Sequence, residues 1–160
     1  MSTFRMSFDI SGLERALEAD KQAVAESVRP AAQAGAQVLY EAVKSNVSRI
    51  KKKTGNLAAS IYQAYSESQS GPAKAAYHIA PNHKKAPHWW LVEYGHYQRY
   101  EVTKDPETGR FFTHKDRPLA TPKHVPGRPY IRPAKDKMPQ AIAAMEARFF
   151  EELKKRGVTR

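Results

Sequence analysis

Residues capable of chemistry are sparse in this sequence, and the densest group lies in the stretch HWWLVEYGH, residues 88–96. It contains His88, Glu93 and His96, residue types that bind metal ions or move protons. His88 and Glu93 are five positions apart and Glu93 and His96 are three apart, a spacing that fits no familiar helical motif such as HExxH. A small metal-dependent hydrolase is one hypothesis, but the spacing disfavours it. The sequence predicts instead that Glu93 is a buried or interfacial charge paired with an arginine.

Other catalytic signatures are missing from the sequence. Ser60 stands in no G-x-S-x-G elbow, and the stretches SESQSGPAK and TKDPETGR each hold a single glycine, too few for a phosphate-cradling loop. No pair of carboxylates stands out as an acid–base couple. The chain has no cysteine, which excludes a disulfide framework and a thiolate metal site. We therefore expect no enzyme, and no catalytic residue, metal or cofactor.

Length and charge constrain the class of protein. A chain of 160 residues suits one domain, so we expect a single domain over residues 1–160, with residues 1–10 as a flexible arm. Its formal net charge is +11, which suits a polyanionic partner, either nucleic acid or an acidic protein surface. Basic residues cluster at 44–53 and 110–135, where Phe111, Phe112 and Tyr130 interleave with them. A nucleic-acid-binding accessory protein is thus an alternative hypothesis, although no helix-turn-helix, zinc finger or RNP pattern supports it.

Signals for export or membrane insertion are not found. The N-terminal stretch lacks a continuous apolar segment and a cleavage site, and no window approaches the roughly 18 apolar residues of a membrane span. We expect a protein that is made and folded in a cytoplasm.

A long amphipathic helix is predicted at the N-terminal end. Ser11 and Glu14 form a capping-box pattern, and apolar residues then recur at three- and four-residue steps from Val24 to Val47. Pro30 interrupts this stripe, so we expect a kink or a break into two helices.

The middle of the chain reads as antiparallel strands. Residues 57–68 and 75–81 are predicted to form one hairpin around the turn SQSGPAK, and residues 89–96 a short helix or strand. Residues 97–126 are predicted to contain an extended hairpin arm, which turns at Asp105–Gly109, and the proline-punctuated loop that follows it.

A last helix is predicted from apolar residues at helical spacing, and it ends before Gly157. These residues are Met138, Ile142, Met145, Phe149 and Leu153. Helices at both ends and an antiparallel sheet between them predict an α+β fold, with the C-terminal helix packed on a central sheet.

Three stretches resemble one protein family when they are read in order. They are TGNLAASI (residues 54–61), WLVEYGH (residues 90–96) and GRPYIRPA (residues 127–134). Together they resemble the tail-component, or neck, family of long-tailed, lambda-like bacteriophages. The departures are His96 in place of a threonine, lysines in place of a proline before Thr54, and a long arm after Tyr97.

The resemblance implies a virion structural protein at the head–tail junction, assembled in the host cytoplasm. Such a protein would form a ring of six or twelve copies that joins head to tail or completes the tail. Its partners would be further copies of itself, a head-closure or connector protein and a tail terminator or tail tube protein, with passing contact to genomic DNA and no membrane.

The segment GRPYIRPA is predicted to be a stiff elbow before the last helix. Pro133 suits the first turn of that helix, and the prolines should keep Arg128 and Arg132 extended, with Tyr130 and Ile131 facing opposite sides. We expect Arg128 or Arg132 to pair with Glu93, in the same subunit or the next. The predicted interface or structural residues are Trp89, Trp90, Glu93, Tyr94, Arg128, Tyr130 and Arg132.

Overall fold

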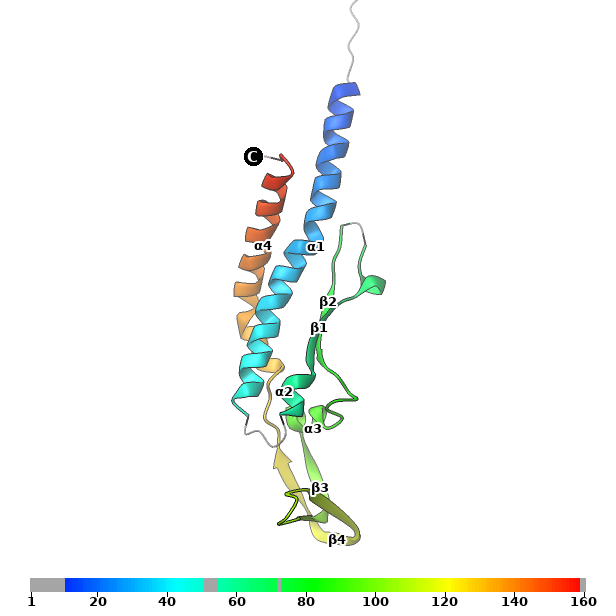
Figure 1. Ribbon diagram of the computed structural model, residues 1–160, viewed down its shortest axis with the longest axis vertical. Helices are drawn as coiled ribbons and strands as arrows, with labels where there is room; N and C mark the ends of the chain where they lie inside the picture. Colours follow the sequence, from blue (N-terminus) through cyan, green and yellow to red (C-terminus); the bar gives the residue numbers. More distant parts are fainter. Residues whose placement is uncertain (1–10, 51–54, 72, 159–160) are drawn as a thin grey trace, which may run out of the picture. The chain divides into compact units, whose positions relative to one another are not determined.

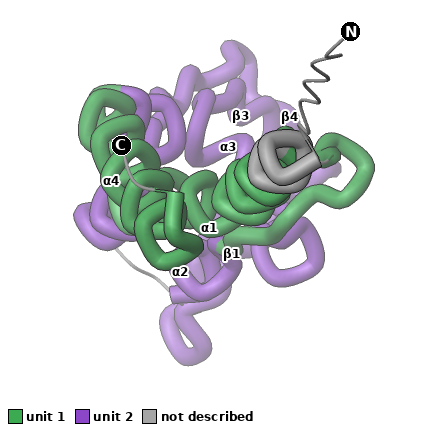
Figure 2. The backbone as a smooth tube through the Cα atoms, turned by 90° about the horizontal axis from the view of Figure 1, so that it is seen from above, with its two compact units in different colours: residues 1–42, 62–80, 136–160 green, residues 43–61, 81–135 purple. Residues whose placement is uncertain are grey.

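The computed structural model describes residues 11–50, 55–71 and 73–158, with side chains from residue 18 onward (Figure 1). The predicted capping box at Ser11 and Glu14, the predicted arm over residues 1–10 and the lysines at 51–53 lie outside the described side chains. The chain divides into two compact units (Figure 2). Unit 1 comprises residues 1–42, 62–80 and 136–160, and unit 2 comprises residues 43–61 and 81–135.

The α+β class predicted from the sequence is confirmed. The helices are α1 (Ser11–Ser48), α2 (Asn56–Ser60), α3 (Trp89–Tyr94) and α4 (Met138–Lys155), with short 3₁₀ turns η1 (Glu67–Gln69) and η2 (Arg132–Lys137). The strands are β1 (Ile61–Tyr65), β2 (Tyr77–Pro81), β3 (Gly95–Lys104) and β4 (Phe111–Pro126). They form two separate two-stranded sheets, β1–β2 and β3–β4, in place of the single central sheet that was expected.

In unit 1 the helices α1 and α4 pack together through small residues. Ala23, Ser27, Ala31 and Gly35 are buried at four-residue steps on α1, which places them on one face. A Cβ atom built on Gly35 would collide with the Met145 side chain of α4 and lie 3.0 Å from the Ala141 carbonyl oxygen. Arg156 Nε donates to Glu26 at 3.2 Å and adds an ion pair between the two helices. The contacts of α4 therefore run along α1, whereas the sequence had placed this helix on the sheet.

Pro30 does not divide α1 into two helices, because the helix is continuous from Ser11 to Ser48 with Pro30 inside it. A proline removes one backbone hydrogen bond from the helix. The buried stripe continues on both sides of it at Ser27 and Ala31, so packing favours helix across the interruption. The kink itself stays a prediction.

The segment before β1 is helical where a strand was predicted. Gly55 has φ +79°, and its carbonyl oxygen accepts from the Ala59 N–H to close the turn of α2. The Ser60 hydroxyl donates to the Leu57 carbonyl oxygen at 2.7 Å. The strand pattern is real but starts at Ile61, and β1 then pairs with β2 as the predicted hairpin.

In unit 2 the hairpin β3–β4 is longer than predicted. Pairing runs from Gly95 with Pro126 to Lys104 with Phe111, so the segment expected to be a loop is largely strand. The register shifts on both sides of Tyr100, and Tyr100 pairs with Pro118. Proline is tolerated in β4 because a strand of a two-stranded sheet has one edge without ladder partners.

The elbow differs from the expectation in one respect. Pro133 lies in η2, and Pro139 is the proline in the first turn of α4. Arg132 is the first residue of η2 and is not part of an extended segment. The reason is that the Glu93 side chain binds the backbone N–H groups of Tyr130, Ile131 and Arg132 and turns the chain there.

Candidate functional site

The candidate site in unit 2 is built on Glu93, which lies on α3 and is 1% exposed. One carboxylate oxygen accepts from the backbone N–H groups of Tyr130 at 2.8 Å and Ile131 at 3.0 Å. The other accepts from the backbone N–H and from Nε of Arg132, both at 3.1 Å. We call these four residues the Glu93 network. The predicted ion pair of Glu93 is confirmed, and its partner is Arg132 of the same chain.

The Glu93 network favours a charged carboxylate. Burial acts to raise the pKa of Glu93, but the three backbone N–H donors and the Arg132 guanidinium outweigh it, so the pKa lies below its usual value of 4.5. Arg132 also donates through Nη2 to the Glu93 carbonyl oxygen at 2.9 Å, and its guanidinium lies 4.9 Å from the centre of the Tyr94 ring. Both oxygens of Glu93 are therefore engaged in holding the elbow, which is a structural task.

Two glycines allow the second and third motif stretches to touch. Gly95 has φ +80°, and a Cβ atom there would lie 2.6 Å from the Gly127 nitrogen. A Cβ atom on Gly127 would lie 2.7 Å from the Tyr94 carbonyl carbon. Such distances cannot be accommodated between backbones, so both positions require glycine. This contact brings Glu93 within reach of the elbow.

Tyr130 is the buried residue of the elbow, as predicted for one of Tyr130 and Ile131. Its carbonyl oxygen accepts from Asn46 Nδ2 at 3.0 Å, which ties the end of α1 to the elbow within unit 2. Burial and, secondarily, the charge of Glu93 raise the pKa of the Tyr130 phenol. Its hydroxyl has no hydrogen-bond partner among the residues that the structure describes.

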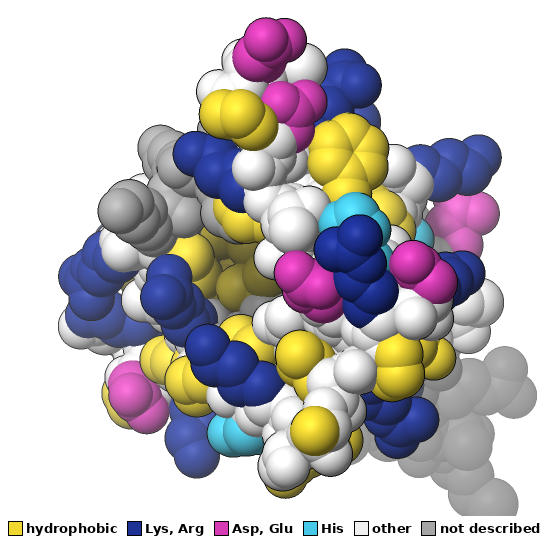
Figure 3. Space-filling view, turned by 90° about the horizontal axis from the view of Figure 1, so that it is seen from below, with side chains coloured by type: hydrophobic (Ala, Val, Ile, Leu, Met, Phe, Trp, Pro, Cys, Tyr) yellow, Lys and Arg dark blue, Asp and Glu magenta, His cyan; other side chains and the backbone are white. Residues whose placement is uncertain are grey.

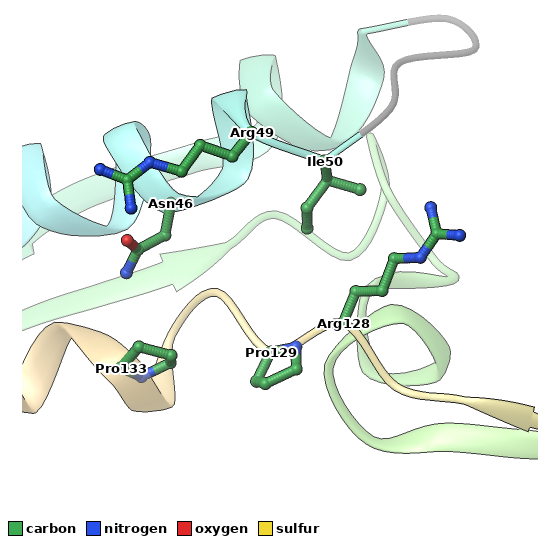
Figure 4. A pocket seen from close by; sticks show the side chains of 6 residues that line it. All are labelled: Asn46, Arg49, Ile50, Arg128, Pro129 and Pro133. Atoms are coloured by element: carbon green, nitrogen blue, oxygen red, sulfur yellow. The ribbon is translucent and has the colours of Figure 1, made fainter.

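A hollow of about 490 Å³ opens beside the elbow, and we call it the arginine hollow (Figure 4). The hollow is lined by Asn46, Arg49, Ile50, Arg128, Pro129 and Pro133. Figure 4 shows Asn46 of α1 and Ile50 of the turn that follows pointing toward the elbow, with the guanidinium groups of Arg49 and Arg128 at different sides. Neither arginine pairs with a carboxylate among the described residues. The lining of the hollow thus combines two cationic side chains with the apolar side chains of Ile50, Pro129 and Pro133.

The remaining predicted residues lie on or near the surface of unit 2. Trp89 is half-buried and its Nε1 donates to the His83 ring, whereas Trp90 and Tyr94 are 50% and 61% exposed. Arg128 uses its backbone N–H, which donates to the Val92 carbonyl oxygen at 2.6 Å. Over the described residues, no group of three or more His, Cys, Asp or Glu side chains is placed to hold a metal ion.

The sequence did not single out Asn46, Arg49 or Gly127 as site residues. The nearest signal was the basic cluster at the end of the first helix, which marks charge but not the hollow that it lines. The contact of Asn46 with Tyr130 spans 84 positions, a separation that no local pattern reports.

Comparison with family models, with curated protein sequences and with solved structures finds no match to this chain. None of the helices in the described residues combines the length and apolar character that crossing a membrane requires.

Proposed function

We propose that this protein is a structural component of a bacteriophage neck, where it forms an oligomeric ring that joins the head to the tail or completes the tail. The sequence motifs are the starting point of this proposal. Two of them, WLVEYGH and GRPYIRPA, meet in the Glu93 network, which supports the view that they maintain a shape and do not perform catalysis.

The observation that carries the proposal is the apolar stripe of α4, part of which is exposed to solvent in the single chain. The stripe consists of Met138, Ile142, Met145, Phe149 and Leu153, and the first three are 45%, 48% and 39% exposed. Phe150 beside it is 60% exposed. Exposed apolar surface of this extent is typical of a protein interface.

A groove in unit 1 continues this apolar surface. It has a volume of about 460 Å³, and its lining includes Ala31 and Ala32 of α1, Ala73 and Ala75 of the β1–β2 connection, and Phe149 of α4. The small side chains on one wall and the aromatic side chain on the other provide the shape that an apolar segment of a neighbouring copy needs. We therefore place the contact between copies on unit 1.

The test is an assembly experiment with matched variants. Ile142→Glu puts a charge in the α4 stripe, whereas Ala147→Glu puts the same charge on an exposed position of the opposite face of α4. We expect Ile142→Glu to fold and to lose self-association in light scattering and native mass spectrometry, and Ala147→Glu to assemble normally.

The function is tested in the virus that encodes the protein. Removing the gene should leave separated heads and tails in electron micrographs of infected cells, and supplying the Ala147→Glu variant should restore joined particles. Joined, infectious particles formed without the protein would overturn the proposal.

A further inference from the structure

The net charge of the protein is confined to unit 2. Of the 27 Lys and Arg residues of the chain, 16 lie in unit 2, together with only 5 of the 16 Asp and Glu residues. Unit 1 holds 11 of each kind. The whole formal charge of +11 therefore belongs to unit 2, and unit 1, which carries the apolar groove, is neutral. This separation indicates two surfaces with different partners.

Within unit 2, the arginine hollow is lined by two cationic side chains that have no anionic partner among the described residues. Arg49 and Arg128 have no carboxylate partner among the described residues, although Arg132 and Arg117 of the same unit do. The sequence places three further lysines directly after Ile50 and no carboxylate between residues 43 and 61. Unpaired guanidinium groups beside an apolar floor are suited to phosphate oxygens, which they bind through two N–H groups each.

From these observations we infer that unit 2 binds the phosphate backbone of nucleic acid, with Arg49 and Arg128 contacting phosphates at the arginine hollow. The two guanidinium groups lie at different sides of the hollow (Figure 4), so two phosphates along a strand suit them better than one isolated phosphate. This inference goes beyond the proposed neck function, because a ring can join head and tail without touching nucleic acid.

The rest of unit 2 favours nucleic acid over an acidic protein patch. Basic residues continue along the β3–β4 hairpin at Lys104, Arg110, Lys115 and Lys123, far along the chain from the hollow, and residues 95–126 hold six Lys and Arg against four Asp and Glu. Phe111 and Phe112 are 48% and 51% exposed on the same hairpin. Figure 3 shows Lys and Arg side chains, with Asp and Glu side chains among them, spread between hydrophobic ones on the face seen from below. A charge that is repeated along an extended surface matches a polyanion with regularly spaced phosphates.

The experiment measures binding of the full chain to a fluorescent DNA duplex across a salt series. The test variant is Arg49→Gln with Arg128→Gln, and the control is Lys137→Gln with Lys154→Gln, which removes two positive charges from unit 1. We expect the control to bind like the wild type and the test variant to bind about tenfold more weakly or worse. The slope of log K against log salt should fall by about 2, since each duplex phosphate contact contributes roughly 0.9.

The outcomes separate this inference from the proposed function. Absence of binding at low salt, or equal losses in both double variants, would overturn it. Displacement of the DNA by poly-glutamate at equal charge concentration would also overturn it, in favour of an acidic protein partner. Circular dichroism and thermal melting confirm that each variant is folded. The Ile142→Glu variant reports on ring assembly alone, so its self-association and the DNA affinity of the wild type fail independently.

Discussion

Glu93 shows how one buried carboxylate sets the path of a segment that lies about forty positions later. It accepts four hydrogen bonds, three of them from consecutive backbone N–H groups of the elbow. Two of those N–H groups, those of Tyr130 and Arg132, belong to residues next to a proline, and none of the three lies in a strand or α-helix that could satisfy it. The Glu93 carboxylate accepts the hydrogen bonds that backbone carbonyl groups accept in a helix or sheet, and the Arg132 guanidinium balances its negative charge.

The first prediction concerns the loss of this charge. Glu93→Gln keeps the size of the side chain but turns an NH₂ group toward N–H donors and leaves Arg132 without its carboxylate. We expect unfolding free energy to fall by about 2–3 kcal/mol in urea denaturation, because buried donors lose their acceptor. Glu101→Gln, which removes an exposed pair with Arg117, is the control and should cost less than about 1 kcal/mol. Equal effects would contradict the role of Glu93.

The pH dependence follows from the same residue. The pKa of Glu93 is lower in the folded chain than its usual value of 4.5, so the unfolded chain takes up the proton first. The stabilisation is complete above pH 4.5 and is lost as the pH falls through the folded pKa. Denaturation midpoints measured between neutral and acid pH should therefore drop more steeply for the wild type than for Glu93→Gln. Parallel curves would argue against this coupling.

Tyr130 contributes a pH dependence of stability that is opposite in sign to that of Glu93. Burial first, and then the Glu93 charge, raise the pKa of its phenol, so the neutral form is favoured on folding and stability falls as the pH rises beyond about 10. Tyr130→Phe removes a hydroxyl that has no partner among the described residues. Thermal melting should show unchanged or slightly higher stability at neutral pH, by up to about 1 kcal/mol, and a weaker alkaline decline. A clear loss at neutral pH would reveal a partner for the hydroxyl.

At the scale of elements, the β3–β4 hairpin depends on the close contact of its two ends. Gly95 begins β3, and Gly127 follows the last residue of β4. Their backbones approach so closely that no side chain fits at either position. The hairpin is therefore attached to the Glu93 network through a contact between main chains.

This contact gives a prediction for glycine substitutions. Gly127→Ala would place a methyl group against backbone atoms of Tyr94 and Glu93, which have little freedom to move. We expect a loss of about 1–3 kcal/mol in chemical denaturation, in line with overpacking elsewhere. Gly71→Ala is the matched control, because a Cβ atom there meets nothing within 4 Å. A neutral Gly127→Ala variant would show that the two ends can separate.

The sequence was informative about elements with a strong local period. The helical spacing of Met138 to Leu153 predicted α4, and the Asp105–Gly109 turn predicted the β3–β4 hairpin. It was misleading where contacts between residues far apart in the sequence determine the secondary structure. Pro118 and Pro126 indicate a loop locally, yet β4 includes them because they pair with Tyr100 and Gly95 of β3.

The site was predictable only in part. A carboxylate in an apolar stretch needs a cation, so pairing with an arginine was foreseeable. The choice between Arg128 and Arg132 was not, because both precede a proline in the same segment and only the path of the elbow separates them. The α4 stripe was read correctly as apolar, but the sequence packed this helix on a central sheet, since periodicity reports amphipathic character and not which surface covers it.

At the scale of the whole molecule, the separation of charge has a thermodynamic effect. Sixteen basic residues against five acidic ones in unit 2 repel one another at low salt. Raising the salt from about 0.01 M to about 0.15 M shortens the screening length from about 30 Å to about 8 Å. We expect the Tm of the wild type to rise by roughly 2–4 °C in calorimetry, equivalent to about 1 kcal/mol for a chain of this size.

The control for the salt effect is a variant with Lys84→Glu and Lys123→Glu, both in unit 2. It carries less excess charge and should respond less to added salt. A Tm of the wild type that stays constant or declines with salt would show that ion pairs in the protein outweigh the repulsion.

β3 begins at Gly95, and the chain leaves β4 at Gly127, whose backbone lies against that of Gly95. The two ends of the hairpin are therefore adjacent, as they are in a segment inserted into a loop. Such a segment can lengthen, shorten or be exchanged for another during evolution without moving the residues on either side. The hairpin can thus change its length or sequence while the main-chain contact between Gly95 and Gly127 that positions it stays the same.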